Sequence, residues 1–269
     1  MQQHLSIKRL LMIFNLFWFE TRKPLILLLL AVGSFLAVWM SVYLAFRNPV
    51  LFSERFQIAY YFIGLFLSGC LSANFLFADL RDKRKSINYL LLPASTLEKF
   101  FAATFFGVVV YLIGYTLIFY MTEPIFVKLS NAMSGRHWKI INVFQMDEYK
   151  DPFFEAKPSR LYFHYFSLQA LFIAGSLYFG KYSFFKTMIV LLFLWIVLVF
   201  LPFPVIAGAL PLGRFNGALT AFEVIDFNGN RLIEMPAWFS LSFKIFYTYL
   251  VTIGLWTASY FLLREKQIA

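Results

Sequence analysis

The chain has 269 residues, of which 61% are hydrophobic and 14% are charged. A soluble domain carries about 45–50% apolar and about 25% charged residues, so this composition excludes a soluble globular protein. The 36 Phe and 15 Tyr exclude a disordered chain, and the single Cys excludes a disulfide-bonded scaffold. The formal net charge is +10, and the basic residues flank apolar runs. This placement favours anionic lipid headgroups over nucleic acid as the partner, and we expect a polytopic protein of the lipid bilayer.

Apolar runs long enough to cross a bilayer recur along the chain. One helical crossing needs about 20 mainly apolar residues. Six segments reach this length, at about 24–46, 56–78, 100–122, 161–180, 188–210 and 240–263. The sequence therefore predicts an all-α polytopic membrane protein, with residues 1–269 forming a single transmembrane domain of six helices.

Residues 4–20 precede the first apolar run and have an amphipathic pattern. Lys8 and Arg9 lie among large apolar residues such as Trp18. We expect these residues to form a helix in the membrane interface. The charged residues that follow, and then Pro24, should separate this helix from the first span. The alternative is a plain N-terminal extension of the first span.

The distribution of charge predicts the orientation of the chain. Six spans place both termini on one side of the membrane. With that side in the cytoplasm, the inner segments 1–23, 79–99, 181–187 and 264–269 hold 13 of the 24 Lys and Arg residues and five of the 14 acidic residues. The net charge is then +8 on the inner segments and +2 on the outer ones. Cytoplasmic segments carry the excess of Lys and Arg, so we expect both termini in the cytoplasm.

The inner segment between the second and third runs has the most distinctive pattern. A dense run of charge comes first, at Arg81, Asp82, Lys83, Arg84 and Lys85. Pro93 should end any short helix before it. Ser95, with Glu98 three residues later, has the form of a capping box that begins the third helix. We expect a short helix at the inner face of the membrane, and the alternative is a solvated charged loop.

Two outer segments, 123–160 and 211–239, are long and polar. In the second, Asn228-Gly229 separates two apolar pairs, Val224-Ile225 and Leu232-Ile233, which indicates a β-hairpin. Both segments are candidate surfaces for an extracytoplasmic partner.

Small residues recur at helical spacing in two of the spans. They are Gly64, Ser68 and Ser72 in the second span, and Ala103 and Gly107 in the third. Such residues allow helix backbones to approach closely in a membrane. They predict either a seam between subunits or ordinary packing within the chain. No Asp, Glu, Lys or Arg lies in the middle of a predicted span, which argues against a proton-coupled or sodium-coupled transporter.

The sequence carries no recognisable active site. Its three His residues lie in three separate regions and offer no metal-ligand spacing. Residues 175–181 match the first part of a phosphate-binding loop, but Tyr182 takes the place of the required Ser or Thr. We expect no catalytic activity, no metal and no cofactor in this chain.

The layout resembles the membrane subunits of ABC-2-type transporters. The residues that carry the resemblance are Leu92 to Phe100 (LPASTLEKF), Gly175 to Thr187 (GSLYFGKYSFFKT) and Leu263 to Gln267 (LREKQ). Together they look like a permease-like group common in Bacteroidetes. The resemblance covers nearly the whole chain.

This resemblance implies a permease subunit for substrate export or extraction. A separate ABC ATPase on the cytoplasmic face would bind ATP and magnesium, and a second membrane subunit, identical or different, would complete the path. It also implies a coupling helix at residues 79–95, whose ATPase contacts would be Arg81, Asp82, Lys83, Arg84, Lys85, Tyr89 and Leu91. The alternative function is a non-transporting scaffold or regulatory subunit of an envelope complex.

Overall fold

A computed structural model gives the structure of the chain. The described residues are 7–46, 52–81, 86–87, 89, 94–135, 137–144, 158–200, 213–214, 221–226, 229–234, 238, 242 and 245–268.

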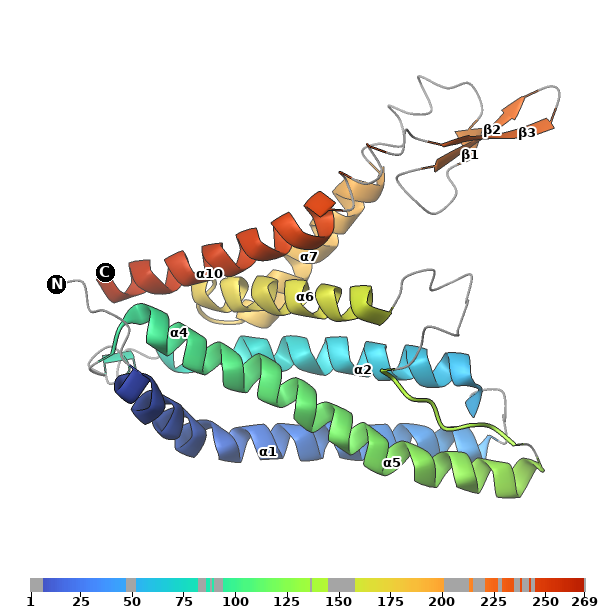
Figure 1. Ribbon diagram of the computed structural model, residues 1–269, viewed down its shortest axis with the longest axis horizontal. Coiled ribbons are helices and arrows are strands. Elements are labelled where there is room, and N and C mark those ends of the chain that lie inside the picture. Colours follow the sequence, from blue (N-terminus) through green and yellow to red (C-terminus); the bar gives the residue numbers. More distant parts are fainter. Residues whose placement is uncertain are drawn as a thin grey trace.

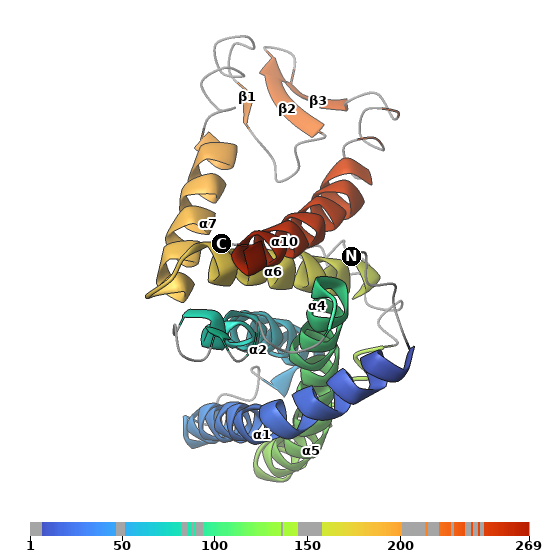
Figure 2. The same cartoon turned by 90° about the vertical axis from the view of Figure 1, so that its left-hand side faces the viewer.

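The first helix, α1, is a single element from Ile7 to Ala45. It does not end before Pro24, so the expected separate helix at residues 4–20 is instead the beginning of α1. Proline inside a helix removes one backbone donor and crowds the preceding turn, which bends the helix. Figures 1 and 2 both show the dark blue first turns of α1 inclined to the rest of the helix.

The second and third predicted spans form two long helices that lie side by side. Helix α2 runs from Glu54 to Phe75, and the short 3-10 helix η2 follows at Ala78–Arg81. The third helix is continuous from residue 96 to residue 134 and has three parts: α4 (Thr96–Thr104), the π-helical segment η3 (Phe105–Val110) and α5 (Tyr111–Ser134). It passes the predicted end at residue 122, so the first part of the predicted outer segment 123–160 is helical.

The remaining helices continue the alternation of direction. They are α6 (Pro158–Tyr178), α7 (Ser183–Phe200), the π-helical segment η5 (Phe246–Leu250) and α10 (Val251–Ile268). The predicted runs 188–210 and 240–263 lie partly outside the described residues. Figure 1 shows each long helix running opposite to the one before it, with both chain ends and the start of α4 at one end of the bundle.

A small antiparallel sheet lies beyond the other end of the helices. It consists of β1 (Gly213–Arg214), β2 (Ala221–Asp226) and β3 (Gly229–Glu234), in the order β1-β2-β3. Asp226 pairs with Gly229, so β2 and β3 form the hairpin that the sequence predicts, and that prediction is confirmed. Among the described residues, the long elements are helices, and residues 137–144 form a non-helical connection after α5.

Long apolar helices indicate a membrane protein. Among the described residues, three helices are long and apolar enough to cross a membrane, judged by length and composition: Leu11–Ala45, Phe56–Phe75 and Thr96–Ser134. Helix α5 also exposes a stripe of apolar side chains at every fourth residue, at Ile113, Leu117, Met121, Ile125 and Leu129. A contiguous exposed apolar surface of this kind suits contact with lipid.

The core lies between α2, the third helix and α6. Figure 2 looks along the bundle and shows α1 and α5 on one side, α2 and α4 in the middle, and α6, α7 and α10 on the other side. Of the tyrosines that are fully buried in this core, Tyr61, Tyr115 and Tyr165 have hydroxyls that are bonded to polar groups. Tyr115 donates to the carbonyl of Tyr61 (3.0 Å), and Tyr61 shares a hydrogen bond with Thr116 (2.8 Å). These bonds remove the cost of burying the hydroxyls, since a buried polar group without a partner is unfavourable.

Candidate functional site

The segment between α2 and α4 is the candidate contact site for a partner. The charged residues Asp82, Lys83, Arg84 and Lys85, and also Leu91, lie outside the described residues. Arg81 is the last residue of η2. Ser86, Ile87 and Tyr89 are described as helical.

Tyr89 joins this segment to three helices. Its ring lies edge-on to Phe17 of α1, with centroids 6.1 Å apart, and to Phe77 after α2, with centroids 6.5 Å apart. Lys99 of α4 donates a hydrogen bond from Nζ to the Tyr89 carbonyl (3.0 Å), and its Nζ lies 5.5 Å from the centroid of the Tyr89 ring. The backbone and the side chain of Tyr89 are therefore both held by the bundle.

The Tyr89 side chain acts as an apolar anchor. Its hydroxyl is buried and has no hydrogen-bond partner among the described residues. Burial raises the pKa of this hydroxyl, and the nearby charge of Glu20 raises it further. The sequence analysis assigned Tyr89 to the surface that meets an ATPase, but the ring packs against helices of its own chain. Among the described residues of this segment, Ile87 is an apolar residue with an exposed side chain (56% exposed).

The start of α4 is fixed by the predicted capping box, which is confirmed. The Ser95 side chain accepts a hydrogen bond from the Glu98 backbone N–H (3.2 Å), and the Glu98 carboxylate accepts one from the Ser95 N–H (2.9 Å). Lys99, the next residue, is only 2% exposed. The cap therefore sets the direction of the Lys99 side chain toward Tyr89.

The predicted small residues of the second and third spans meet at the π-helical segment. A π-turn leaves carbonyl groups without their usual helical donors, and neighbouring helices supply donors here. Ser72 of α2 donates to the Gly107 carbonyl (2.9 Å), and Tyr165 of α6 donates to the Val108 carbonyl (3.1 Å). Ala103 is fully buried one turn earlier.

Two glycines are needed for these close approaches. A Cβ atom on Gly107 would overlap the Leu76 side chain, and one on Gly64 would overlap the Tyr115 hydroxyl. Ser68 instead donates to the Gly64 carbonyl of its own helix. The small residues thus pack within the chain, and Gly64, Ser72, Ala103 and Gly107 all lie at or near contacts between helices.

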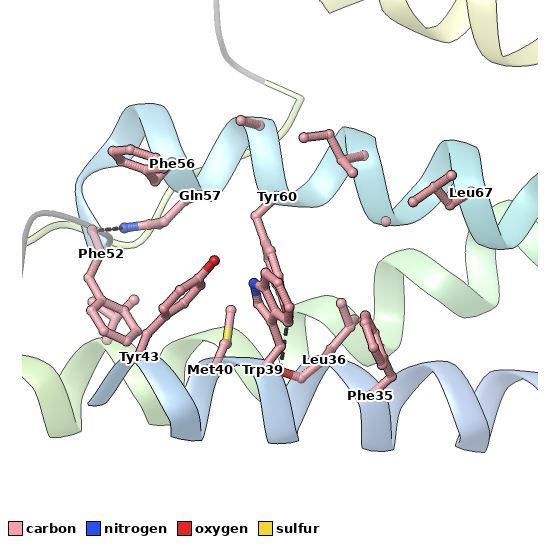
Figure 3. A pocket seen from close by; sticks show the side chains of 14 residues that line it. Phe35, Leu36, Trp39, Met40, Tyr43, Phe52, Phe56, Gln57, Tyr60 and Leu67 are labelled. Atoms are coloured by element: carbon pink, nitrogen blue, oxygen red, sulfur yellow. Dashed lines mark hydrogen bonds between the residues drawn. The ribbon is translucent and has the colours of Figure 1, made fainter. Parts of the chain in front are cut away.

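A cavity of about 380 Å³ lies between α1 and α2. Its walls are almost entirely apolar, as Figure 3 shows, with Phe35, Trp39, Met40 and Leu67 among them. Gln57 lies at one end and donates to the Phe52 carbonyl (2.7 Å). Val127 of α5 also contributes to the wall.

Glu123 is a buried carboxyl that the sequence analysis missed. It lies on α5 one turn before Val127, and it has no exposed surface. Neither carboxyl oxygen has a hydrogen-bond partner among the described residues. The apolar stripe on α5, which continues at every fourth residue past residue 122, is the sequence signal that would have placed Glu123 inside a helix.

The contacts of the described residues are packing contacts and hydrogen bonds between helices. Within the described ranges, no group of three or more His, Cys, Asp or Glu residues could hold a metal ion. Comparisons with protein-family models, with curated proteins and with solved structures give no match. The functional argument therefore rests on the sequence and on the geometry above.

Proposed function

We propose that this chain is the membrane-spanning permease subunit of a transporter that is driven by a separate cytoplasmic ATPase. In this proposal six helices cross the inner membrane of a bacterium, and both termini are cytoplasmic. The ATPase, which carries ATP and magnesium, docks on residues 79–95. A second membrane subunit completes the translocation path for export or extraction of substrate.

The arrangement of the helices supports this topology. The long helices alternate in direction, and the chain ends lie at the same end of the bundle as the start of α4 (Figure 1). This end also carries the denser positive charge of the sequence, which favours the cytoplasmic side. The small sheet and the connection after α5 lie at the opposite end.

The observation that carries the proposal is the attachment of Tyr89 to α1, α2 and α4. A coupling element must pass a displacement from its partner to the membrane helices. The Tyr89 ring contacts Phe17 and Phe77, and the Tyr89 carbonyl is bonded to Lys99. A push on this segment therefore reaches three helices at once, whereas a loosely attached loop would absorb it.

The exposed side of the segment supplies the docking contacts in this proposal. Ile87 is apolar and exposed, and the charged run precedes it. Apolar anchors carry much of the affinity of an interface, while charges at its rim mainly tune association and its dependence on salt. Ile87 should therefore matter more for affinity than any single Lys or Arg.

Purification from native membranes tests the proposal. We expect the tagged chain to co-purify with a protein that carries a nucleotide-binding loop and hydrolyses ATP. Replacing Ile87→Ala should weaken this complex about tenfold at any salt concentration, which corresponds to about 1.4 kcal/mol. Reversing Lys83→Glu and Arg84→Glu together should weaken it mainly at low salt.

A matched substitution on another exposed apolar residue provides the control. Phe144→Ala lies at the opposite end of the bundle and should leave the complex intact. If no ATPase co-purifies, or if the Ile87 and charge-reversed variants bind it like the unaltered chain, residues 79–95 are not a coupling element. The scaffold or regulatory function would then be favoured.

A further inference from the structure

Glu123 lies in an environment that does not suit a charged carboxylate. It is on the third of the long apolar helices, and its side chain has 0% exposed surface. Both of its oxygens lack hydrogen-bond partners among the described residues. A buried ionised carboxylate without a partner is strongly unfavourable, and such a group keeps its proton instead.

The titratable groups that interact with Glu123 among the described residues are tyrosine hydroxyls. The Glu123 carboxyl interacts electrostatically with the hydroxyl of Tyr60 on α2 and with those of Tyr115 and Tyr120 on α5. The Tyr60 hydroxyl also interacts electrostatically with Tyr43 of α1. Tyrosine hydroxyls are neutral at physiological pH, so they supply no positive charge to balance a carboxylate. Among the basic residues that follow Glu123 in the chain, Lys128, His137 and Lys139 are exposed, and Arg136 lies outside the described residues.

Residues 137–144, which we call the outer strap, are bonded to the two helices beside Glu123. Gln57 of α2 donates to the Lys139 carbonyl (3.1 Å) and accepts from the Ile141 N–H (3.3 Å). Tyr120 of α5 accepts from the Val143 N–H (2.7 Å). Ile141 and Val143 are themselves buried, so the strap is part of the packing at this end of the bundle.

A proton is the ligand that this site fits best. Hard metal cations such as calcium or magnesium need about six oxygen ligands, and the described part of the chain has no group of three or more His, Cys, Asp or Glu residues that could hold a metal ion. A single carboxyl can bind a proton without any further ligand.

We propose that Glu123 is a proton-binding site, neutral while the outer strap is bonded to α2 and α5, and that it releases its proton to water when the strap detaches. In the closed arrangement the carboxyl is a neutral acid. When the strap opens, water reaches the carboxyl, the O–H bond breaks, and the carboxylate and a hydrated proton form. Opening of this end of the bundle is thereby linked to external pH. The inference does not depend on the proposed ATPase, but its link to external pH rests on the proposed topology, in which the strap lies outside the cell.

Infrared spectroscopy of the full-length protein tests the protonation state. At neutral pH in heavy water we expect a band from a protonated carboxylic acid, which Glu123→Gln should remove. Glu54→Gln, at a half-exposed acid at the start of α2, should leave the band unchanged. If the unaltered protein shows no such band, or if Glu123→Gln leaves it in place, the proposal is wrong.

Thermal stability provides a second measurement. A carboxyl that holds its proton more tightly in the native state than in the unfolded state stabilises the native state at low pH. This stability is lost as pH rises. From about pH 5 to about pH 9, the unaltered protein should lose thermal stability more steeply than Glu123→Gln. The amide resembles the neutral acid in shape and charge, so this variant should fold. A variant that misfolds, or that is less stable at every pH, would show that the carboxylate charge is needed and would overturn the proposal.

The link to the strap is tested separately with Gln57→Ala. This variant removes two hydrogen bonds to the strap, at Lys139 and Ile141, and leaves Glu123 itself intact. The carboxyl band should then disappear at a pH about one unit lower, because water reaches the carboxyl more easily. Ser259→Ala is the control, since it removes a hydrogen bond between α10 and α6, to the Ala170 carbonyl, and leaves the bonds of the strap in place. If Gln57→Ala leaves the midpoint unchanged, proton release is not linked to the strap.

Discussion

At the residue scale, single side chains at each end of the bundle have a defined role because of what they contact. Tyr89 contacts Phe17 and Phe77 through its ring and Lys99 through its carbonyl. Glu123 differs, because neither of its carboxyl oxygens has a hydrogen-bond partner among the described residues. The first residue stabilises a segment by packing, and the second makes stability depend on pH.

Two substitutions at Tyr89 distinguish the contribution of its ring to stability from that of its hydroxyl. The hydroxyl has no described partner, so Tyr89→Phe should leave thermal stability unchanged or raise it slightly. Tyr89→Ala removes the ring and should destabilise the protein by about 1–3 kcal/mol, less than for a fully buried aromatic residue because Tyr89 is half-buried. Thermal unfolding in detergent measures both changes. Equal losses in the two variants would mean that the hydroxyl, and not the ring, makes the important contact.

At the scale of elements, the close packing of α2 against η3 depends on Gly107. A Cβ atom there would overlap Leu76, so Gly107→Ala should destabilise the protein by about 1–3 kcal/mol. Gly254→Ala in α10 is the matched control, because a Cβ atom there meets nothing within 4 Å. Alanine favours a helix over glycine, so the control should be neutral or stabilising by about 0.5–1 kcal/mol. Thermal unfolding compares the two, and equal effects would show that this contact is unimportant.

Local sequence signals predicted several elements correctly. The Ser95–Glu98 capping box and the hairpin around Asn228-Gly229 each depend on a few neighbouring residues, so the sequence contains the whole signal. The proline at residue 24 was expected to end a helix, yet it only bends α1 (Figures 1 and 2). A proline removes one hydrogen bond, which a long helix with other packing contacts tolerates.

Features that depend on distant contacts could not be predicted from the sequence. Glu123 and Pro124 resemble the end of a span, but the third helix continues to Ser134. The burial of this region depends on residues 137–144 and on α2, which lie far away in sequence. The inward direction of Tyr89 likewise depends on Phe17, 72 positions earlier. No local periodicity encodes either contact.

At the scale of the whole molecule, the number of membrane crossings decides where the C-terminus lies. Three described helices are long and apolar enough to cross. The described long helices form six runs, α1, α2, α4 to α5, α6, α7 and η5 to α10, and Figure 1 shows that they alternate in direction. Three crossings from a cytoplasmic N-terminus would leave the C-terminus outside the cell, whereas six would return it to the cytoplasm. Lys139, in the outer strap, would be outside in both cases.

Labelling of single cysteines in intact cells distinguishes these topologies. The native Cys70 is buried and is first replaced by alanine. With six crossings, Lys139→Cys should react with a membrane-impermeant maleimide added outside, and Glu265→Cys should react only after the cells are opened. Both positions are exposed, so neither should be hidden by packing. Labelling of Glu265→Cys from outside would show an odd number of crossings. The ATPase could then not meet the chain ends and residues 79–95 on a single face, and the permease proposal would lose its geometric basis.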